Sequence, residues 1–414
     1  MTEFSSLGLS EATLRAVTAE GYTTPTGIQQ QAIPQILDGA DLIGSAQTGT
    51  GKTAAFVLPM LDRLAARPGK PKGGTSKALI LAPTRELAQQ IGNALKTYGR
   101  NQRLSHAVIV GGAKYGPQIK SLTRGVDIVV ATPGRLEDHM ASGHLTLDST
   151  DMVVLDEADQ MLDLGFLPAI KRILGAMPEV RQTLLFSATM PPAIRQLSNT
   201  FLRNPQEIAV AGAKDPVAEI DQEVRIVETA AKRDALVNIL NGAEVERSIV
   251  FTRTKRGADK VSEHLEASGL RAAAIHGDKS QGQRERTLNA FRRNRVQVLV
   301  ATDVAARGID VANVSHVVNY EMPDVAEAYI HRIGRTGRAG ARGSAISLCD
   351  PGERRLLKDI ERVTGQRLVA PGAFPPPPHG QRRNGPGKPA GAKGRHGPSS
   401  AKRGGGRDNR RSAA

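Results

Sequence analysis

Aromatic residues are scarce in this chain, and tryptophan is absent. Aromatic residues make up 3% of the 414 positions and hydrophobic residues 39%, so aliphatic side chains must fill the cores. The single cysteine, Cys349, excludes an internal disulfide and is typical of a reducing compartment. We expect Cys349 to be a small core residue without redox chemistry.

Long apolar stretches are missing as well. No segment approaches the roughly 18 to 20 apolar residues that a membrane-spanning helix needs. The first residues, MTEFSSLGLS, lack the basic and apolar regions of a secretory signal. The sequence therefore predicts a cytoplasmic protein that makes no use of a membrane.

The positive charge is concentrated at the C-terminal end. Residues 371–414 hold ten Lys or Arg and one acid, so they carry +9 of the net charge of +15. From residue 369 to 414 the sequence is rich in Gly, Pro and Arg and has too few apolar residues to offset the entropy of ordering. We assign this tail no fold. It either binds a polyanion through salt-sensitive contacts or only keeps the protein soluble.

Parallel α/β sheets are predicted ahead of the tail. Short β-branched runs alternate with helical patterns, which is typical of strands covered by helices on both faces. The runs are Asp41–Gly44, Ala78–Pro83, Asp127–Thr132, Met152–Asp156, Ser248–Thr252, Val296–Thr302 and Ser344–Leu348. A chain of 414 residues is long enough for two such units.

An internal repeat supports two similar units. KALILAPTRELAQQI from Lys77 aligns with RSIVFTRTKRGADKV from Arg247, and VDIVVATPG from Val126 aligns with VQVLVATDV from Val296. Both alignments have an offset of 170 positions, which favours a duplication over chance similarity between buried strands. We expect units at 1–208 and 220–368, joined by a linker at 209–219 that contains Gly and Pro and has no clear periodicity.

A glycine-rich segment follows the first apolar run. Ala46-Gln-Thr-Gly-Thr-Gly-Lys-Thr53 matches the phosphate-binding P-loop, except that Ala46 stands at the usual first glycine. Gly49 and Gly51 would let backbone N–H groups turn toward phosphate oxygens. Lys52 would place a charge on the outer phosphates, and Thr53 would bind Mg²⁺. A glycine-rich loop without nucleotide is the alternative, which the Lys-Thr pair after a strand disfavours.

Three acids occur in the four residues Asp156-Glu157-Ala158-Asp159, directly after the buried run MVVL. Such a group is more often a solvated turn, but the P-loop about 100 residues upstream favours a phosphate site. Asp156 would hold Mg²⁺, and Glu157 would orient or deprotonate the attacking water.

Seven segments together resemble the motif set of the DEAD-box helicases, in order and in spacing. They are AQTGTGKT at 46–53, PTRELA at 83–88, TPGR at 132–135, DEAD at 156–159, SAT at 187–189, ATDVAARGID at 301–310 and HRIGRTGR at 331–338. The resemblance covers Phe4 to about Leu368 and, through HGDKSQGQR from His276 and the short N-terminus, is strongest to the bacterial RhlE-like group. It implies two tandem RecA-like domains and an RNA-stimulated ATPase that unwinds short RNA duplexes or remodels RNA–protein complexes.

The resemblance also implies an ATP site shared by both units. Around the P-loop it assigns nucleotide contacts to Tyr22, Gln29, Gln47, Thr48, Gly49, Thr50, Gly51, Lys52, Thr53 and Asp310. Gln29 would read adenine through its amide, although Gly27 stands where the family usually has proline. Arg335 and Arg338 would reach the γ-phosphate as arginine fingers, so hydrolysis would require the units to close. Ser187, Thr189 and His331 would couple the nucleotide and RNA sites.

A second set of residues matches family positions that hold a single-stranded RNA backbone. They are Thr84, Arg85, Gly112, Thr132, Gly134 and Arg135 in the first unit and Arg253, Gln281, Arg284 and Thr302 in the second. Hydroxyls, guanidiniums and loop N–H groups suit phosphate and 2′-OH contacts, so sequence specificity should be weak. Helix caps and surface turns are the alternative for individual Thr and Gly residues.

The expected partners are single-stranded RNA and short duplexes, with ribosome assembly or RNA decay machinery, and the protein is expected to be a monomer. A non-enzymatic RNA-binding scaffold is disfavoured by Lys52, Glu157 and the two arginines of HRIGRTGR. A DNA translocase on the same fold is disfavoured by DEAD in place of DEAH and by Gln29.

Overall fold

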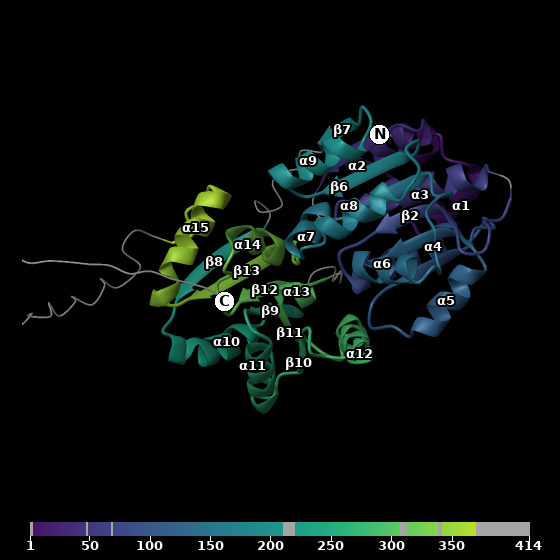
Figure 1. Cartoon of the computed structure of the whole chain (residues 1–414). Coiled ribbons are helices and arrows are strands. Elements are labelled where there is room, and N and C mark those ends of the chain that lie inside the picture. The colour runs from purple at the N-terminus through teal and green to yellow at the C-terminus, as the bar shows by residue number, and fades with distance from the viewer. Residues whose placement is uncertain are drawn as a thin grey trace, which may run out of the picture. The chain divides into compact units, whose positions relative to one another are not determined.

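The computed structural model describes residues 3–46, 49–67, 69–209, 220–306, 311, 313–337 and 342–369. These residues form two sheets, in which every strand pairing is parallel, and helices flank each sheet (Figure 1). The predicted class of two parallel α/β units is therefore confirmed.

The first lobe contains a sheet with the strand order β3-β4-β2-β5-β6-β1-β7. Its strands are β1 (Leu42–Ser45), β2 (Ser76–Leu81), β3 (His106–Ile109), β4 (Val126–Ala131), β5 (Met152–Leu155), β6 (Gln182–Ser187) and β7 (Gln206–Ala209). Its helical segments are η1 (Phe4–Leu7), α1 (Glu11–Ala19), α2 (Gly27–Leu37), α3 (Lys52–Ala65), α4 (Arg85–Tyr98), α5 (Tyr115–Thr123), α6 (Pro133–Ala141), α7 (Ala158–Asp163), α8 (Leu167–Gly175) and α9 (Pro192–Phe201).

Both faces of this sheet are buried, because successive side chains of a strand point to opposite faces. In β4, Ile128 and Val130 pack with α2, α3 and α4, whereas Val129 and Ala131 pack in the core that includes α6, α8 and α9. Continuous apolar runs are the consequence of such double burial.

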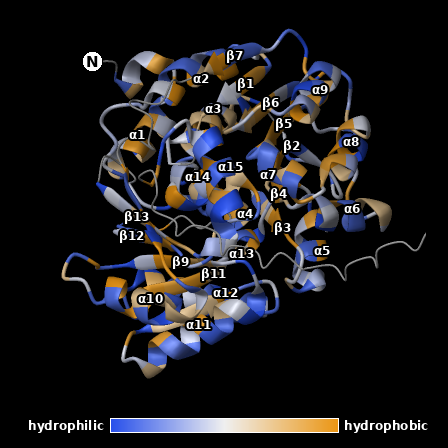
Figure 2. Ribbon diagram, turned by 90° about the vertical axis from the view of Figure 1, so that its left-hand side faces the viewer, coloured by the Kyte–Doolittle hydropathy of each residue, from blue (hydrophilic) through white to orange (hydrophobic). Residues whose placement is uncertain are grey.

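The second lobe has the strand order β10-β11-β9-β12-β13-β8. Its strands are β8 (Ile220–Ile226), β9 (Ser248–Thr252), β10 (Ala272–Ile275), β11 (Val298–Thr302), β12 (His316–Asn319) and β13 (Gly343–Cys349). Its helical segments are η3 (Thr229–Ala231), α10 (Lys232–Leu240), α11 (Lys255–Ala267), α12 (Gln281–Arg292), α13 (Asp303–Ala306), α14 (Ala326–Ile333), η4 (Pro351–Glu353) and α15 (Arg354–Thr364). In Figure 2 the strands carry orange, hydrophobic residues, whereas α11 and α15 show blue, hydrophilic ones.

The predicted repeat recurs in the pairing of the strands. Leu81 of β2 lies beside Ala131 of β4, and Phe251 of β9 lies beside Ala301 of β11, which are the same positions shifted by 170. The order β3-β4-β2-β5-β6 in the first lobe also corresponds to β10-β11-β9-β12-β13 in the second. The two lobes thus share both topology and register.

Four further observations concern the linker, the tail, the cysteine and membrane-spanning helices. The predicted linker at 209–219 lies outside the described residues apart from Ala209, and the predicted tail at 369–414 does so apart from Val369. Cys349 is a fully buried free thiol at the end of β13, as expected. No helix in the part of the chain that the structure describes is long and apolar enough to span a membrane.

Candidate functional site

The P-loop connects β1 to the start of α3. Gly49 and Gly51 have φ of 89° and 88°, in the left-handed region that glycine adopts without strain. A Cβ atom on Gly51 would lie 2.5 Å from Nε2 of Gln29, so the close approach also requires glycine. Ala46 packs in the buried cluster of α2 and α3, where its methyl group fills space. Gln47 and Thr48 lie outside the described residues.

The predicted acids follow β5, next to β2 and β6 at the centre of the sheet. The Asp156 N–H donates to the Leu81 carbonyl oxygen at 3.0 Å, which extends the sheet to this carboxylate. Burial raises the pKa of Asp156 to about 7; the Lys52 charge opposes this rise, and the Glu157 carboxylate adds to it. Glu157 has φ 54° and ψ 53°, a left-handed conformation that is strained for a residue with a side chain.

Three charged atoms of this site need a partner. Among the residues that the structure describes, Lys52 Nζ, Asp156 Oδ1 and Glu157 Oε2 are buried and have no hydrogen-bond partner. Unpaired buried charges are costly, so they indicate a place that a ligand completes. Lys52 can meet phosphate oxygens, and the two carboxylates can meet a cation or water. The described residues contain no group of three His, Cys, Asp or Glu that could hold a metal ion.

Asp159 connects the DEAD segment to the SAT segment. Its N–H donates to Ser187 Oγ at 3.2 Å, and its Oδ2 accepts from the Thr189 N–H at 2.9 Å and from Thr189 Oγ1 at 3.0 Å. The structure therefore brings Ser187 and Thr189 to the acidic segment. Sequence reasoning gave Asp159 no role, although its place in the run of three acids was a signal.

The Gln29 side chain is held between two backbone segments. Its Oε1 accepts from the Thr26 N–H at 2.9 Å in a capping box at the start of α2, and its Nε2 donates to the Gly51 carbonyl oxygen at 3.1 Å. Gly27 begins α2 without disturbing this cap. Tyr22 is 51% exposed and lies 6.4 Å from the Tyr98 ring. Gln29 is thus fixed against the P-loop, and its contact with adenine stays a prediction.

The arginine segment of the second lobe is organised by Arg332, which sequence reasoning did not single out. Its guanidinium pairs with Asp303 through two contacts of 2.5 and 2.7 Å and donates to the Glu321 carbonyl oxygen at 2.7 Å. Arg335 is buried three residues later, and its Nε donates to the His331 carbonyl oxygen at 3.3 Å. Asp310 and Arg338 lie outside the described residues.

The first-lobe residues predicted to face RNA gather at the carboxyl ends of three neighbouring strands. Thr84 follows β2 and caps α4, where its Oγ1 accepts from the Leu87 N–H at 3.2 Å. Gly112 follows β3 with φ 71°, and the Arg85 guanidinium lies against it. Thr132, Gly134 and Arg135 follow β4 at the start of α6.

The second-lobe residues predicted to face RNA do not all lie in equally open surroundings. Thr302 ends β11, and Arg253 follows the neighbouring strand β9. However, the Arg253 guanidinium lies within 4 Å of carboxylates of Glu321, Asp324 and Glu353, at 3.8, 3.4 and 3.3 Å. A phosphate would have to compete with these acids.

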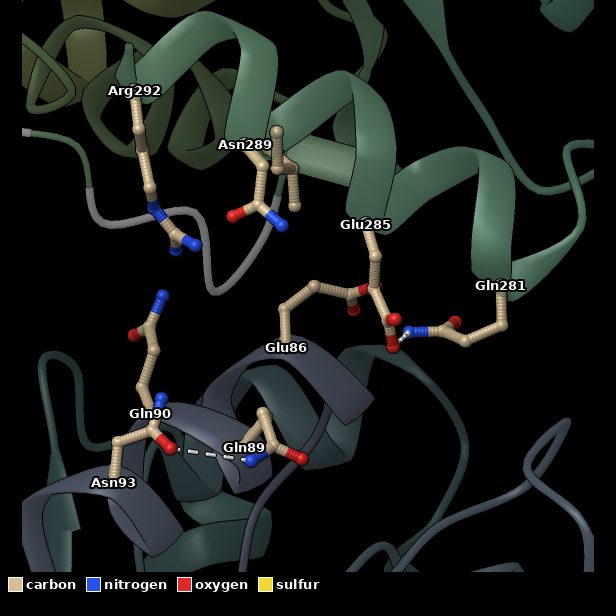
Figure 3. A pocket seen from close by; sticks show the side chains of 9 residues that line it. Glu86, Gln89, Gln90, Asn93, Gln281, Glu285, Asn289 and Arg292 are labelled. Carbon is tan, nitrogen blue, oxygen red and sulfur yellow. Dashed lines mark hydrogen bonds between the residues drawn. The ribbon is translucent and has the colours of Figure 1, made fainter.

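Gln281 and Arg284 of α12 contact α4. Arg284 forms an ion pair of 3.0 Å with Glu86, and Arg85 Nη1 donates to Gln281 Oε1 at 3.4 Å. Figure 3 shows Glu86 of α4 pointing toward Gln281 and Glu285 of α12, at a polar cavity of about 270 Å³. Three predicted RNA-facing residues therefore contact one another or Glu86, a partner that the sequence alone did not suggest.

Comparisons with known proteins match the same segments. A sequence model described as DEAD/DEAH box helicase matches residues 26–197, and one described as helicase conserved C-terminal domain matches residues 231–340. ATP-dependent RNA helicase DeaD of Mycobacterium tuberculosis is 48% identical over 368 residues, which are 88% of this chain and 64% of that protein. DEAD-box ATP-dependent RNA helicase CshA of Bacillus cereus is 45% identical, over 89% of this chain and 69% of that protein.

Solved structures agree with the fold. S. cerevisiae Dbp5 bound to RNA and ADP BeF3 has a TM-score of 0.80 and 33% identity, over 89% of this chain and 95% of that chain. A DEAD box protein from Methanococcus jannaschii has a TM-score of 0.53 and 38% identity, over 89% and 98%. The chain spans less than two thirds of the DeaD relative, and the RhlE-like subgroup stays a prediction.

Proposed function

The chain belongs to the DEAD/DEAH box helicase family, and from this premise we propose that it is an ATP-dependent RNA helicase. It would bind single-stranded RNA by the backbone, hydrolyse ATP when RNA is bound, and locally unwind short duplexes or remodel RNA–protein complexes. The observation that carries this proposal is the group of unpartnered buried charges on Lys52, Asp156 and Glu157.

The P-loop would bind the triphosphate of ATP. Backbone N–H groups at Gly49 and Gly51 would meet phosphate oxygens, and Lys52 Nζ would find there the acceptors that the protein does not supply. Thr53 and Asp156 would hold Mg²⁺, largely through water, and this ion would neutralise charge on the outer phosphates. Gln29, fixed against Gly51, would meet the adenine edge.

Hydrolysis would depend on residues from both lobes. Glu157 is held by a strained backbone at the end of β5, where its carboxylate would orient the attacking water. Arg335 and Arg338 would stabilise charge on the transferred phosphoryl group, so turnover would require closure of the lobes. The contacts of Asp159 with Ser187 and Thr189 support a link from the nucleotide to the RNA-facing loops.

The RNA-facing loops carry the other half of the proposal. Thr84, Gly112 and Arg135 offer a hydroxyl, a loop N–H and a guanidinium at the ends of neighbouring strands, which suits a sugar–phosphate backbone. Closure on one strand would bend it, and a bent strand does not fit a continuous A-form duplex. A few base pairs would therefore open locally.

The central test compares the ATPase rate of the full chain without nucleic acid, with single-stranded RNA and with DNA of the same sequence. We expect stimulation by RNA and little by DNA. Glu157→Gln should lose turnover by roughly two orders of magnitude or more while it retains ATP and RNA binding.

Glu179→Gln is a matched control, because the Glu179 side chain is 94% exposed. It should behave as the unaltered protein. Equal rates with and without RNA would remove the proposed coupling, and stimulation by DNA alone would favour a DNA translocase.

A further inference from the structure

An aromatic stack lies directly beneath the first-lobe loops proposed to meet RNA. Tyr115, the first residue of α5, lies parallel to His139 of α6, with ring centroids 4.3 Å apart and an angle of 6° between the planes. His144 meets both rings edge-on, with centroids at 5.8 Å from Tyr115 and 5.4 Å from His139. The guanidinium carbon of Arg135 lies over the Tyr115 ring, 5.1 Å from its centroid.

The stack is unusual as core packing. His139 is fully buried, yet among the described residues neither of its ring nitrogens has a hydrogen-bond partner. A buried imidazole without hydrogen bonds destabilises the fold relative to an apolar side chain of the same size, because the desolvation of its nitrogens is not compensated. Burial, followed by the charges of His144 and Arg135, lowers the pKa of His139, whereas Asp138 acts in the opposite direction. This direction favours the uncharged ring beside the Arg135 guanidinium.

Arg135 depends on this stack for its place. Its Nη1 donates to the Ala113 carbonyl oxygen at 3.3 Å, and its Nε lies 3.5 Å from an Asp138 carboxylate that is 63% exposed. The side chain itself is only 15% exposed. The Tyr115 ring thus provides a flat surface for a guanidinium that otherwise has one carbonyl and one solvated acid.

The same stack fixes the loop that contains Gly112. Lys114, at the N-cap of α5, makes no side-chain cap, so the start of this helix needs another anchor. The Tyr115 ring provides it on one side, and Gln118 Nε2 donates to the carbonyl oxygens of Val110 and Lys114 at 3.1 and 3.3 Å on the other. The Gly112 loop is thereby held at Val110, directly after β3, and at the start of α5.

We propose that Tyr115 and His139 are positioning residues for RNA: their stacked rings hold Arg135 and the Gly112 loop in the arrangement that receives the sugar–phosphate backbone. This inference rests on the proposed function, because it concerns the same RNA-facing loops. Preordering a long side chain reduces the entropy lost on binding, so the stack acts on RNA affinity and not on ATP chemistry.

The test measures ATPase rates of the full chain against the concentration of a single-stranded uridine oligonucleotide. Tyr115→Leu and His139→Leu should raise the RNA concentration for half-maximal rate about tenfold. The maximal rate, the KM for ATP and the rate without RNA should stay unchanged. Tyr115→Phe and His139→Phe keep the flat rings and should restore half-saturation.

A double variant distinguishes an effect through Arg135 from a general destabilisation of the first lobe. Tyr115→Leu with Arg135→Ala should weaken RNA binding by less than the sum of the two single losses, because the contact between Tyr115 and Arg135 is removed by either change and only the effect on the Gly112 loop remains. Unchanged half-saturation in both leucine variants, additive losses in the double variant, or a fall in maximal rate alone would overturn the inference. If the unaltered protein shows no response to RNA, the proposed function fails and the inference fails with it.

Discussion

Asp156 lies in surroundings that disfavour its charged form. Because burial raises its pKa to about 7, the folded nucleotide-free protein binds a proton at this carboxyl more tightly than the unfolded chain does. The contribution of Asp156 to stability is therefore largest at low pH and is lost as pH rises from about 4 to about 7. The buried carboxylate thus lowers the free energy of unfolding of the nucleotide-free protein at neutral pH, and a bound ligand would remove this cost.

We predict that Asp156→Asn makes the nucleotide-free protein more stable at pH 8, by about 1 to 2 kcal/mol, while ATPase activity is lost. The amide keeps the shape of the carboxyl and removes the buried charge. Urea unfolding at pH 8 and pH 5.5 would measure this, and the difference between the two proteins should shrink at pH 5.5. A variant less stable than the unaltered protein at pH 8 would contradict the account.

Some residues of the site could be predicted from the sequence, whereas the partners of others could not. The P-loop and DEAD residues could be placed from the sequence because their spacing after apolar strands fixes their position in a parallel sheet. The neighbours of Arg253 could not, since Glu321 and Glu353 lie 68 and 100 positions away and belong to no shared pattern. Arg332 escaped notice for the same reason, because Asp303 becomes its partner only when α13 and α14 meet.

At the scale of elements, buried charge joins the start of α10 to the start of α15. Lys232 Nζ lies 2.6 Å from Glu353 Oε2 and 3.4 Å from Asp350, and its side chain is 2% exposed. Glu353 Oε1 also accepts from the Met322 N–H at 3.1 Å, after β12. The Arg253 guanidinium lies 3.3 Å from Glu353 Oε1, so removing Lys232 leaves the buried carboxylate with one cation in place of two.

We predict that Lys232→Met destabilises the second lobe by about 3 kcal/mol. Lys255→Met is the matched control, because Lys255 pairs with Asp278 at 2.5 Å while 53% exposed, and it should change stability by less than about 1 kcal/mol. Unfolding in urea gives both values. The double variant Lys232→Met with Glu353→Gln should recover part of the loss, and equal effects of the two lysine variants would refute the role of burial.

The elements themselves were largely predictable. The seven runs identified in the sequence coincide with β1, β2, β4, β5, β9, β11 and β13. Their ends differ from those of the strands by two residues at most, and the run Ser248–Thr252 has the same bounds as β9. Short strands such as β3 and β10 have four residues each and lie at sheet edges, where little sequence is available to signal them. The order of the strands in each sheet could not be predicted from any local pattern. The internal repeat indicated only that the two lobes would have the same order.

At the scale of the whole molecule, positive charge is unevenly distributed along the sequence. The tail at 371–414 carries +9, whereas the rest of the chain carries +6. Cations distributed along a polar chain bind phosphates without a fixed geometry, and each phosphate neutralised releases counterions. We therefore propose that the tail raises the local concentration of RNA near the RNA-facing loops.

Deleting residues 371–414 should weaken RNA binding at low salt and flatten its salt dependence, with a slope smaller by roughly 0.7 for each phosphate that the tail no longer neutralises. A chain of unchanged length, with the ten basic residues of the tail replaced by Ser or Gln, is the control for mere length. It should bind as weakly as the deletion. RNA titrations across several salt concentrations supply the slopes, and unchanged affinity at low salt would reduce the tail to a solubility extension.

The two lobes begin equivalent helices with the same kind of cap. Thr84 caps α4, and Thr254, 170 positions later, caps α11 through the Gly257 N–H at 3.0 Å. Each lobe thus presents the electropositive end of a helix after the equivalent strand. If the proposed function holds, these two equivalent helix starts would offer the same N–H geometry to two phosphates of one strand, and neither would distinguish one base from another.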